Sequence, residues 1–193
     1  RTLEEFDFSF QNSVSQQTVR DLSTFKFIEA KENLILLGPS GVGKSHLAIA
    51  LGIEAVNAGY HVHFTTMDDL ANKMYACLAD GGLPRYIRSL LRNDLIILDE
   101  VGYLTLDKIA SDHLFQLISK TYENVSMIIT SNLDFSDWGT LFASPSTAAA
   151  VLDRLLHHAH VIVLRGESYR IRNRLVPPQK NPAGGCQSEE EDT

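Results

Sequence analysis

The chain has 193 residues, of which 44% are hydrophobic and 21% charged, and its 17 Lys and Arg against 24 Asp and Glu give a formal net charge of −7. This composition excludes a disordered chain, a collagen-like chain and a small disulfide scaffold, and the length suits one domain of about 100 to 200 residues. The 2 cysteines form neither a disulfide framework nor a CxxC site, which favours a reducing cytoplasm. No apolar stretch approaches the ~18 residues that a membrane span requires, and no signal-peptide pattern is present.

More than half of the excess negative charge lies at the end of the chain. Residues 181–193 hold four acids and no base, so residues 1–180 carry 17 bases against 20 acids. This end has little apolar surface to bury, and we predict that residues 177–193 form a disordered acidic tail. Because the chain begins with Arg1 rather than Met, we expect an additional upstream domain in the intact protein.

Short runs of Val, Ile and Leu alternate along the chain with longer amphipathic stretches. The predicted strands are residues 33–37, 60–65, 94–98, 125–130 and 160–164. The predicted helices are residues 14–29, 43–58, 67–79, 84–92, 107–122 and 147–157. Three of the strands are almost continuously apolar, as parallel strands covered on both faces are. The alternation predicts a three-layer α/β fold with right-handed crossovers.

A glycine-rich segment follows the first predicted strand and precedes a helix. It matches the pattern GxxxxGK[ST] and comprises Gly38, Pro39, Ser40, Gly41, Val42, Gly43, Lys44 and Ser45. Its glycines let the backbone approach a polyphosphate, and its N–H groups and the helix N-terminus attract phosphate oxygens. Lys44 is placed to reach the β- and γ-phosphates, and the Ser45 hydroxyl to bind Mg²⁺. We include the next residue, His46, in this predicted P-loop site.

Two adjacent carboxylates, Asp99 and Glu100, follow the apolar run Leu95–Leu98. This pattern matches a Walker B strand, in which Asp99 holds Mg²⁺ and Glu100 polarises the attacking water as a general base. A lone pair of acids at a strand end is more often solvated, but a complete P-loop in the same chain favours the Walker B interpretation.

The strand Ile128-Ile129-Thr130 ends in Ser131 and Asn132. If this strand lies between the two previous ones, Asn132 lies near the γ-phosphate and can orient the attacking water. Taken alone, an asparagine after a strand is more often a turn residue.

These motifs together resemble the AAA+ ATPases, and more closely the IstB-like ATP-binding proteins that assist insertion-sequence transposition, with the DnaC-type helicase loaders as relatives. The resemblance runs from about Leu3 to Arg170. Its segments are LEEFDFSF, LLGPSGVGKSHLAIALG, LIILDEVGYL, IITSNLDFSDW and VLDRLLHHAHVIVLRGESYR. It implies a parallel five-stranded sheet of order 5-1-4-3-2. It also implies an AAA+ domain over residues 1–176, with a linker and helix in residues 1–30 and a helical insert in residues 67–92.

Two arginines acquire roles from this resemblance. Arg154 resembles an arginine finger that enters a neighbouring subunit's ATP site, and Arg170 resembles a second sensor that contacts phosphate in cis. A planar guanidinium can bind the charge that develops on the γ-phosphoryl oxygens. The alternative is that each is a surface arginine, paired with Asp153 or Glu167.

Two basic stretches offset the negative net charge. Helical spacing places Arg85, Arg88 and Arg92 on one face of the insert and apolar residues on the other, and this stripe resembles a DNA contact. The alternative is an ordinary solvated helix face. The stretch 165–180 has a net charge of +4. Since no base-reading motif is present, we expect binding to the DNA backbone rather than to sequence.

Two further groups of residues are of types that can bind a ligand. Phe6, Phe8 and Phe10 alternate in a segment that can line a base pocket, although packing against the sheet is the more common use. His157, His158 and His160 have no fourth ligand nearby in sequence, and we assign them to a helix C-terminus rather than to a metal site.

The sequence therefore predicts a Mg-ATP-dependent ATPase that forms homo-oligomers on DNA and assists a transposase. Adenine is the favoured base because no [NT]KxD guanine motif follows a strand. The alternatives are a DnaC-like helicase loader, a P-loop kinase for a small molecule and a nucleotide-binding switch with little hydrolysis.

Overall fold

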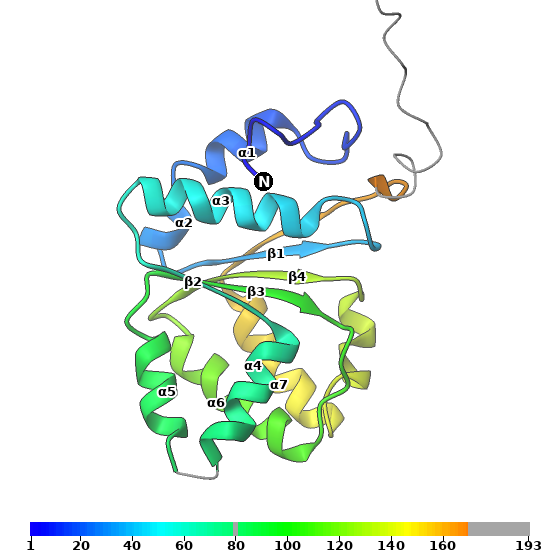
Figure 1. The fold of residues 1–193 in the computed structure, drawn as a ribbon. Coiled ribbons are helices and arrows are strands. Elements are labelled where there is room, and N and C mark those ends of the chain that lie inside the picture. The colour runs from blue at the N-terminus through cyan, green and yellow to red at the C-terminus, as the bar shows by residue number, and fades with distance from the viewer. Residues whose placement is uncertain (79–80, 170–193) are drawn as a thin grey trace, which may run out of the picture.

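The computed structural model describes residues 1–78 and 81–169, which contain one parallel five-stranded sheet (Figure 1). Its strands are β1 (Asn33–Leu37), β2 (Val62–Thr66), β3 (Leu95–Val101), β4 (Ser126–Ser131) and β5 (Ala159–Val163). The strand order β2-β3-β4-β1-β5 confirms the expected order 5-1-4-3-2. The predicted tail and most of the basic stretch 165–180 lie outside the described residues.

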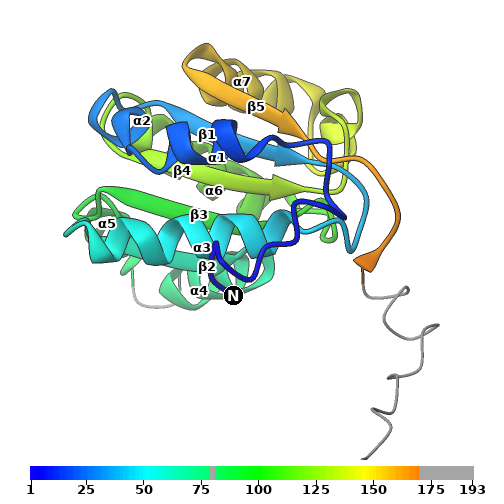
Figure 2. The same ribbon diagram turned by 90° about the horizontal axis from the view of Figure 1, so that it is seen from above.

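Helices cover both faces of the sheet, which gives three layers (Figures 1 and 2). One face carries α1 (Gln16–Leu22), α2 (Lys26–Glu29) and α3 (Lys44–Asn57). The other face carries α4 (Met67–Leu78), α5 (Leu83–Leu90), α6 (Lys108–Thr121), the 3₁₀ helix η1 (Phe135–Thr140) and α7 (Pro145–His157). No helix in these two described stretches is long and apolar enough to span a membrane.

The alternation of side chains along the strands divides the core into two halves. In β1, Leu34 and Leu36 pack in the cluster that includes α3, whereas Ile35 and Leu37 pack in the cluster that includes α4, α6 and α7. Every residue of β1 is buried, as expected for a strand between two neighbours and two helical layers. This burial fixes the register, because a shift by one residue would exchange the two faces.

The parallel strands give the sheet two functionally different edges. We call the edge where the strands end the carboxyl edge, and the edge where they begin the amino edge. Leu37 pairs with Ser131, so the residues that follow β1 and β4 leave the sheet side by side. Residues after β1, β3 and β4 therefore meet at the carboxyl edge, which is where ligands bind in open α/β sheets.

A buried asparagine joins three elements at the amino edge. The Asn33 side chain donates to the Leu155 carbonyl at 3.1 Å and accepts from the Met127 N–H at 3.0 Å. The Asn33 N–H donates to the His158 carbonyl at 2.7 Å. These bonds fix the end of α7 against the first residues of β1 and β4.

The predicted helix 14–29 is wrong, because the structure contains two helices there. The Ser23 hydroxyl donates to the Val19 carbonyl at 2.9 Å, and the Thr24 hydroxyl donates to the Asp21 carbonyl at 2.7 Å. Phe25 then adopts a left-handed φ of 56°, which turns the chain before α2. Side chains that bond back to the preceding turn thus end α1 although the apolar pattern continues.

Other element bounds also differ from the predictions. β3 extends to Val101, and α5 ends at Leu90, so Arg92 lies just beyond the helix. α7 begins at Pro145, where the Ser144 side chain caps the helix and proline occupies its first turn. The helix η1 was not predicted.

Candidate nucleotide site at the carboxyl edge

The P-loop connects the end of β1 to the start of α3 at the carboxyl edge. Gly38 and Gly41 have φ values of 141° and 86°. A Cβ on Gly38 would lie 2.0 Å from the Leu164 carbonyl oxygen, and one on Gly41 would lie 2.1 Å from the Ser168 hydroxyl oxygen. Both positions therefore require glycine, for conformation and for space. The close neighbours of the loop come from the segment that follows β5.

Lys44, the first residue of α3, is held against the loop itself. Its Nζ donates to the Gly38 carbonyl at 2.6 Å and to the Pro39 carbonyl at 2.7 Å. The side chain thus crosses the loop interior and places its ammonium group where a β- or γ-phosphate is expected.

Asp99 is the meeting point of three elements. Its carboxylate is buried and accepts from the Ser45 hydroxyl at 2.8 Å and from the Thr130 hydroxyl. A carboxylate and hydroxyls are oxygen ligands of the kind that Mg²⁺ prefers, so Ser45 and Asp99 fit the predicted metal role. Thr130 was not singled out from the sequence, because its role depends on the pairing of β3 with β4.

Glu100 leaves the sheet through a bulge. The β3–β4 register shifts between Leu98 and Val101, and Glu100 has a left-handed φ of 64°. Its N–H donates to the Thr130 hydroxyl at 3.0 Å, while its side chain is exposed and lines a cavity beside the P-loop. A left-handed conformation costs a residue other than glycine ~1–2 kcal/mol, and such strain is characteristic of functional sites. Because of this bulge, the side chains of Glu100 and Asp99 point in different directions.

Asn132 reaches the same cavity from the end of β4. Its Oδ1 atom is buried and, within the described part of the chain, has no hydrogen-bond partner. A Cβ on Gly102 would lie 2.4 Å from this atom, so the glycine after the Walker B strand makes room for the amide. An unpaired buried acceptor beside the phosphate loop is suited to a water molecule or a ligand donor.

The cavity has a volume of about 250 Å³ and is closed on one side by the N-terminal segment, residues 1–14. Gln11 Nε2 donates to the Val42 carbonyl at 2.8 Å, and the Tyr169 N–H donates to the Gly41 carbonyl at 3.0 Å. The rings of Phe10 and Tyr169 meet edge to face with centroids 5.1 Å apart. Both rings line the cavity and offer apolar surface to a planar base.

Other residues of this segment have different surroundings. Phe6 lines the cavity and contacts the ring of His46, and His46 Nε2 lies 2.9 Å from the Thr2 carbonyl oxygen. Phe8 is not among the lining residues and packs against Phe6 with centroids 4.9 Å apart. The sequence did not point to Tyr169, which the segment after β5 brings to the P-loop.

Arg154 does not lie in this cavity. It projects from the last turns of α7, where its Nη1 donates to the Ala150 carbonyl at 2.8 Å and its guanidinium lies 4.9 Å from the centre of the Phe115 ring. It shares a small hollow at the amino edge with Asn33 and His158. A role in hydrolysis therefore requires the ATP site of another subunit. Arg170 lies outside the described residues.

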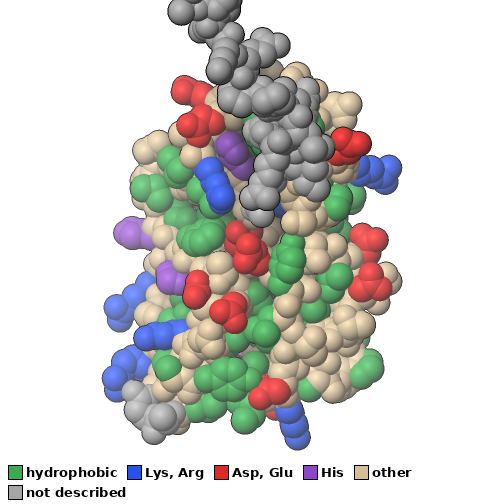
Figure 3. Space-filling view, turned by 45° about the vertical axis from the view of Figure 1, so that its right-hand side comes forward, with side chains coloured by type: hydrophobic (Ala, Val, Ile, Leu, Met, Phe, Trp, Pro, Cys, Tyr) green, Lys and Arg blue, Asp and Glu red, His purple; other side chains and the backbone are tan. Residues whose placement is uncertain are grey.

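The predicted basic stripe is exposed on the insert between β2 and β3. Leu83, Ile87 and Leu90 are the buried residues of α5. The side chains of Arg85, Arg88 and Arg92 are exposed. Figure 3 shows Lys and Arg side chains gathered at the lower left of the molecule, where α4 and α5 lie.

Comparison with known proteins identifies the family. Residues 1–176 match the family model described as "IstB-like ATP binding protein". The chain belongs to this family. It is 42% identical over 180 residues to the "Insertion sequence IS5376 putative ATP-binding protein" of Geobacillus stearothermophilus, with 93% of this chain and 72% of the relative covered. It is 44% identical over 174 residues to the "Insertion sequence IS21 putative ATP-binding protein" of Pseudomonas aeruginosa, with 90% and 66% covered.

Solved structures with the same fold include proteins of DNA replication. DnaI has a TM-score of 0.69 at 18% identity, covering 85% of this chain and 90% of that one. The replication initiator DnaA bound to AMPPCP and single-stranded DNA has a TM-score of 0.66 at 22% identity, covering 90% and 54%. The DnaC helicase loader has a TM-score of 0.63 at 20% identity, covering 79% and 92%. The IstB-like chain therefore has the AAA+ P-loop fold.

Proposed function

We propose that this IstB-like chain hydrolyses Mg-ATP, assembles with copies of itself on DNA and assists a transposase. The convergence of Lys44, Glu100 and Asn132 on one cavity, with Asp99 bonded to Ser45 of its lining, carries the ATPase part of the proposal. The membership of its relatives in insertion sequences supports the transposition part. The alignments cover 72% and 66% of the two insertion-sequence relatives, and the upstream domain expected from the sequence remains part of the proposal.

In the proposed binding step, the triphosphate lies along residues 38–45. Lys44 exchanges its contacts with the Gly38 and Pro39 carbonyls for oxygens of the β- and γ-phosphates. Ser45 and Asp99 would hold Mg²⁺, whose charge would offset that of the phosphate oxygens. Phe10 and Tyr169 contact the base at the other end of the cavity.

In the proposed chemical step, Glu100 accepts a proton from a water molecule that the Asn132 amide orients. The water oxygen forms a bond to the γ-phosphorus while the bond from that phosphorus to the β–γ bridging oxygen breaks, which gives ADP and phosphate. Positioning and electrostatics supply most of the catalysis in such a transfer. Arg154 lies at the amino edge, away from the P-loop of its own subunit, so the proposal assigns it to the ATP site of a neighbouring subunit. There its guanidinium stabilises the charge on the γ-phosphoryl oxygens.

The proposed DNA contact is the exposed face of α5 with Arg85, Arg88 and Arg92. Three guanidinium groups per subunit, repeated along an assembly, combine weak phosphate contacts into strong and salt-dependent binding. A structural neighbour, DnaA, is described in complex with single-stranded DNA.

A helicase loader is the second candidate, because the DnaC helicase loader shares the fold over 92% of its own length. Both candidates use the same ATP chemistry and differ in partner. Co-purification with the transposase of the same insertion sequence, compared with a replicative helicase, distinguishes them.

Phosphate release from ATP, measured with and without duplex DNA alongside light scattering, tests the proposed function. We expect DNA to stimulate release and to increase scattering together. Release that is indifferent to DNA would instead favour a kinase or a switch.

A further inference from the structure

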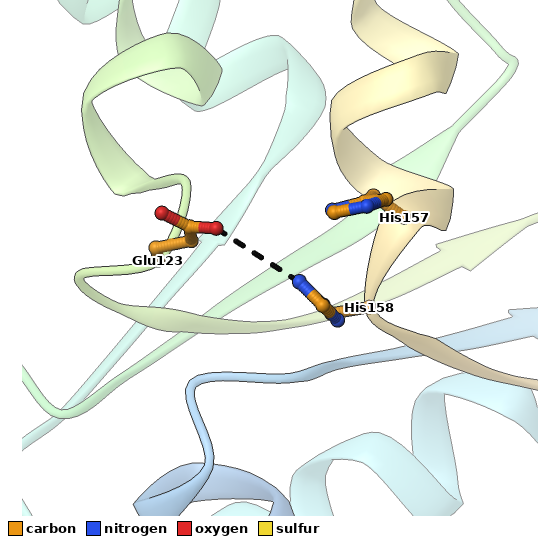
Figure 4. A group of neighbouring side chains, drawn as sticks. All are labelled: Glu123, His157 and His158. Atoms are coloured by element: carbon orange, nitrogen blue, oxygen red, sulfur yellow. Dashed lines mark ion pairs between the residues drawn. The ribbon is translucent and has the colours of Figure 1, made fainter.

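Three side chains of types that can bind a metal ion meet at the amino edge, away from the nucleotide site. Glu123 lies in the turn between α6 and β4, His157 ends α7, and His158 follows it (Figure 4). One ligand atom of each lies within 4.8 Å of the others, and all three side chains are exposed. The histidines alone gave no reason to assign a metal, because the third ligand comes from a distant part of the sequence.

The backbone brings these side chains together. Successive residues of a helix point about 100° apart, but His158 leaves α7 with φ −129° and ψ 76°. The two imidazole rings consequently have centroids only 4.1 Å apart. Glu123 has a left-handed φ of 59°, and its Oε1 lies 3.9 Å from His158 Nε2. Figure 4 shows the carboxylate facing His158 across the gap between the turn and the helix end.

The Tyr122 hydroxyl contacts two side chains of this three-residue cluster. Its hydroxyl lies 2.6 Å from His157 Nδ1 and within hydrogen-bonding reach of the Glu123 carboxylate. When Tyr122 donates to Glu123, its oxygen accepts from Nδ1–H of His157 and the Nε2 lone pair is free for a ligand bond. Histidines in metal sites are commonly held by such a hydrogen bond on the other ring nitrogen.

We propose that Glu123, His157 and His158 bind a divalent transition-metal ion of the Zn²⁺ type, with water completing its shell. Two imidazole nitrogens with one carboxylate favour Zn²⁺, Ni²⁺ or Cu²⁺ over Mg²⁺ and Ca²⁺. Tetrahedral Zn²⁺ requires its ligand atoms about 3.3 Å apart, a closure that exposed side chains reach by rotation. The proposal does not rest on ATP hydrolysis or on DNA binding.

The location links the site to Arg154. His158 and Arg154 line the same hollow, and Arg154 lies about one turn before His157 in α7. A metal ion would join the end of α7 to the turn after α6. The same two helices already touch where Arg154 of α7 contacts the ring of Phe115 in α6. Metal binding would thereby restrict the helix end that presents Arg154.

Competition with a chromophoric zinc chelator, in excess Mg²⁺ and with ZnCl₂ as the probe, tests the site. We expect one Zn²⁺ whose affinity falls at least tenfold in Glu123→Gln and in His158→Asn. Tyr122→Phe, which keeps the ligands and removes the supporting hydroxyl, should weaken binding by about 10 to 100-fold.

His160→Asn is the matched control. His160 is also exposed and lies 2.7 Å from a carboxylate oxygen of Glu32, but this pair lacks a second histidine. The control should bind Zn²⁺ as the wild-type chain does, and all variants should unfold at similar temperatures in EDTA. The proposal is overturned if the wild type binds no Zn²⁺, or if Glu123→Gln and His158→Asn bind it as tightly as His160→Asn.

Discussion

The charged groups proposed to hold ligands at the two edges of the sheet include pairs that differ in burial. At the carboxyl edge, Lys44 and Asp99 are buried and are bonded to their own loop or to neighbouring strands. At the amino edge, Glu123, His157 and His158 are exposed and loosely spaced. Buried charged groups must be paired, so the carboxyl edge is organised before a ligand arrives. The amino edge is suited to ligands that come from outside, such as an ion or another subunit.

One glutamate at each edge shows how the surroundings of the two edges differ. Glu100 and Glu123 both adopt a left-handed backbone, with φ values of 64° and 59°, and both side chains are exposed. Glu100 follows a buried strand and lines the nucleotide cavity, whereas Glu123 lies in a turn beside two histidines. The same residue type with similar backbone strain therefore lies in two different surroundings, and the two proposals assign it different chemistry because of these neighbours.

Removing Arg154 should have the largest effect on turnover. We expect Arg154→Ala to slow ATP hydrolysis by about 10³-fold in the assembled protein, the lower range for arginine fingers. Lys44→Ala should also be inactive, but a mixture of the two variants should recover activity, since one supplies an intact P-loop and the other an intact Arg154. Phosphate release from the mixture is the measurement, and Arg20→Ala, an exposed arginine of α1, is the control. A mixture no more active than its components would contradict action in trans.

Glu100→Gln should have the next largest effect. An amide cannot accept the proton of the attacking water, so we expect hydrolysis to fall by about 10²-fold or more with ATP affinity retained. Glu123→Gln should leave hydrolysis near the wild-type rate when no transition metal is present. Binding of a fluorescent ATP analogue and phosphate release separate the two effects. Equal turnover in the wild type and Glu100→Gln would remove the general-base role.

Replacing Arg85, Arg88 and Arg92 together by Ala should weaken DNA binding at all sequences alike. If each contacts one phosphate, the slope of log affinity against log salt should decrease by ~2.7. The control replaces Arg20, Lys26 and Lys108, which are exposed on other helices. Fluorescence anisotropy across salt concentrations measures both. An unchanged slope in the α5 variant would mean that DNA binds elsewhere.

Asn33→Ala should have the smallest effect on function. It leaves the Leu155 carbonyl and the Met127 N–H without their partner, which should lower the free energy of unfolding by about 1–3 kcal/mol. ATP turnover per folded molecule should not change, because the amide lies at the amino edge. Urea denaturation measures the stability, with the exposed Asn57→Ala as control. A loss of turnover without loss of stability would show that the two edges are coupled through the strands.

The nucleotide site was predicted from the sequence because its signals are local. The P-loop glycines are required by φ and by close approach, and Asp99 and Glu100 directly follow a buried run. The strand order came from resemblance to a family and is confirmed by the structure. Once β4 lies between β1 and β3, Asn132 reaches the same cavity as the P-loop.

The residues that were missed depend on contacts between distant segments. Thr130 bonds both Asp99 and the Glu100 N–H only because β3 and β4 pair in this register. Tyr169 and Glu123 lie in segments without regular patterns, and only the fold brings them to the P-loop and to the histidines. The break between α1 and α2 had a local signal, the Ser23-Thr24 pair, which the helical periodicity outweighed.

The N-terminal segment covers the nucleotide cavity and is held there by hydrogen bonds from its side chains to main-chain groups. Gln11 bonds the P-loop at Val42, and the Ser13 hydroxyl accepts from the Arg165 N–H at 3.0 Å, so the two ends of the described chain meet over the loop. If a base binds beside Phe10 and Tyr169, as proposed, these contacts would have to open before it leaves. The lifetime of bound ADP would then depend on how often this cover opens, and slow opening would make product release the rate-limiting step of the proposed cycle.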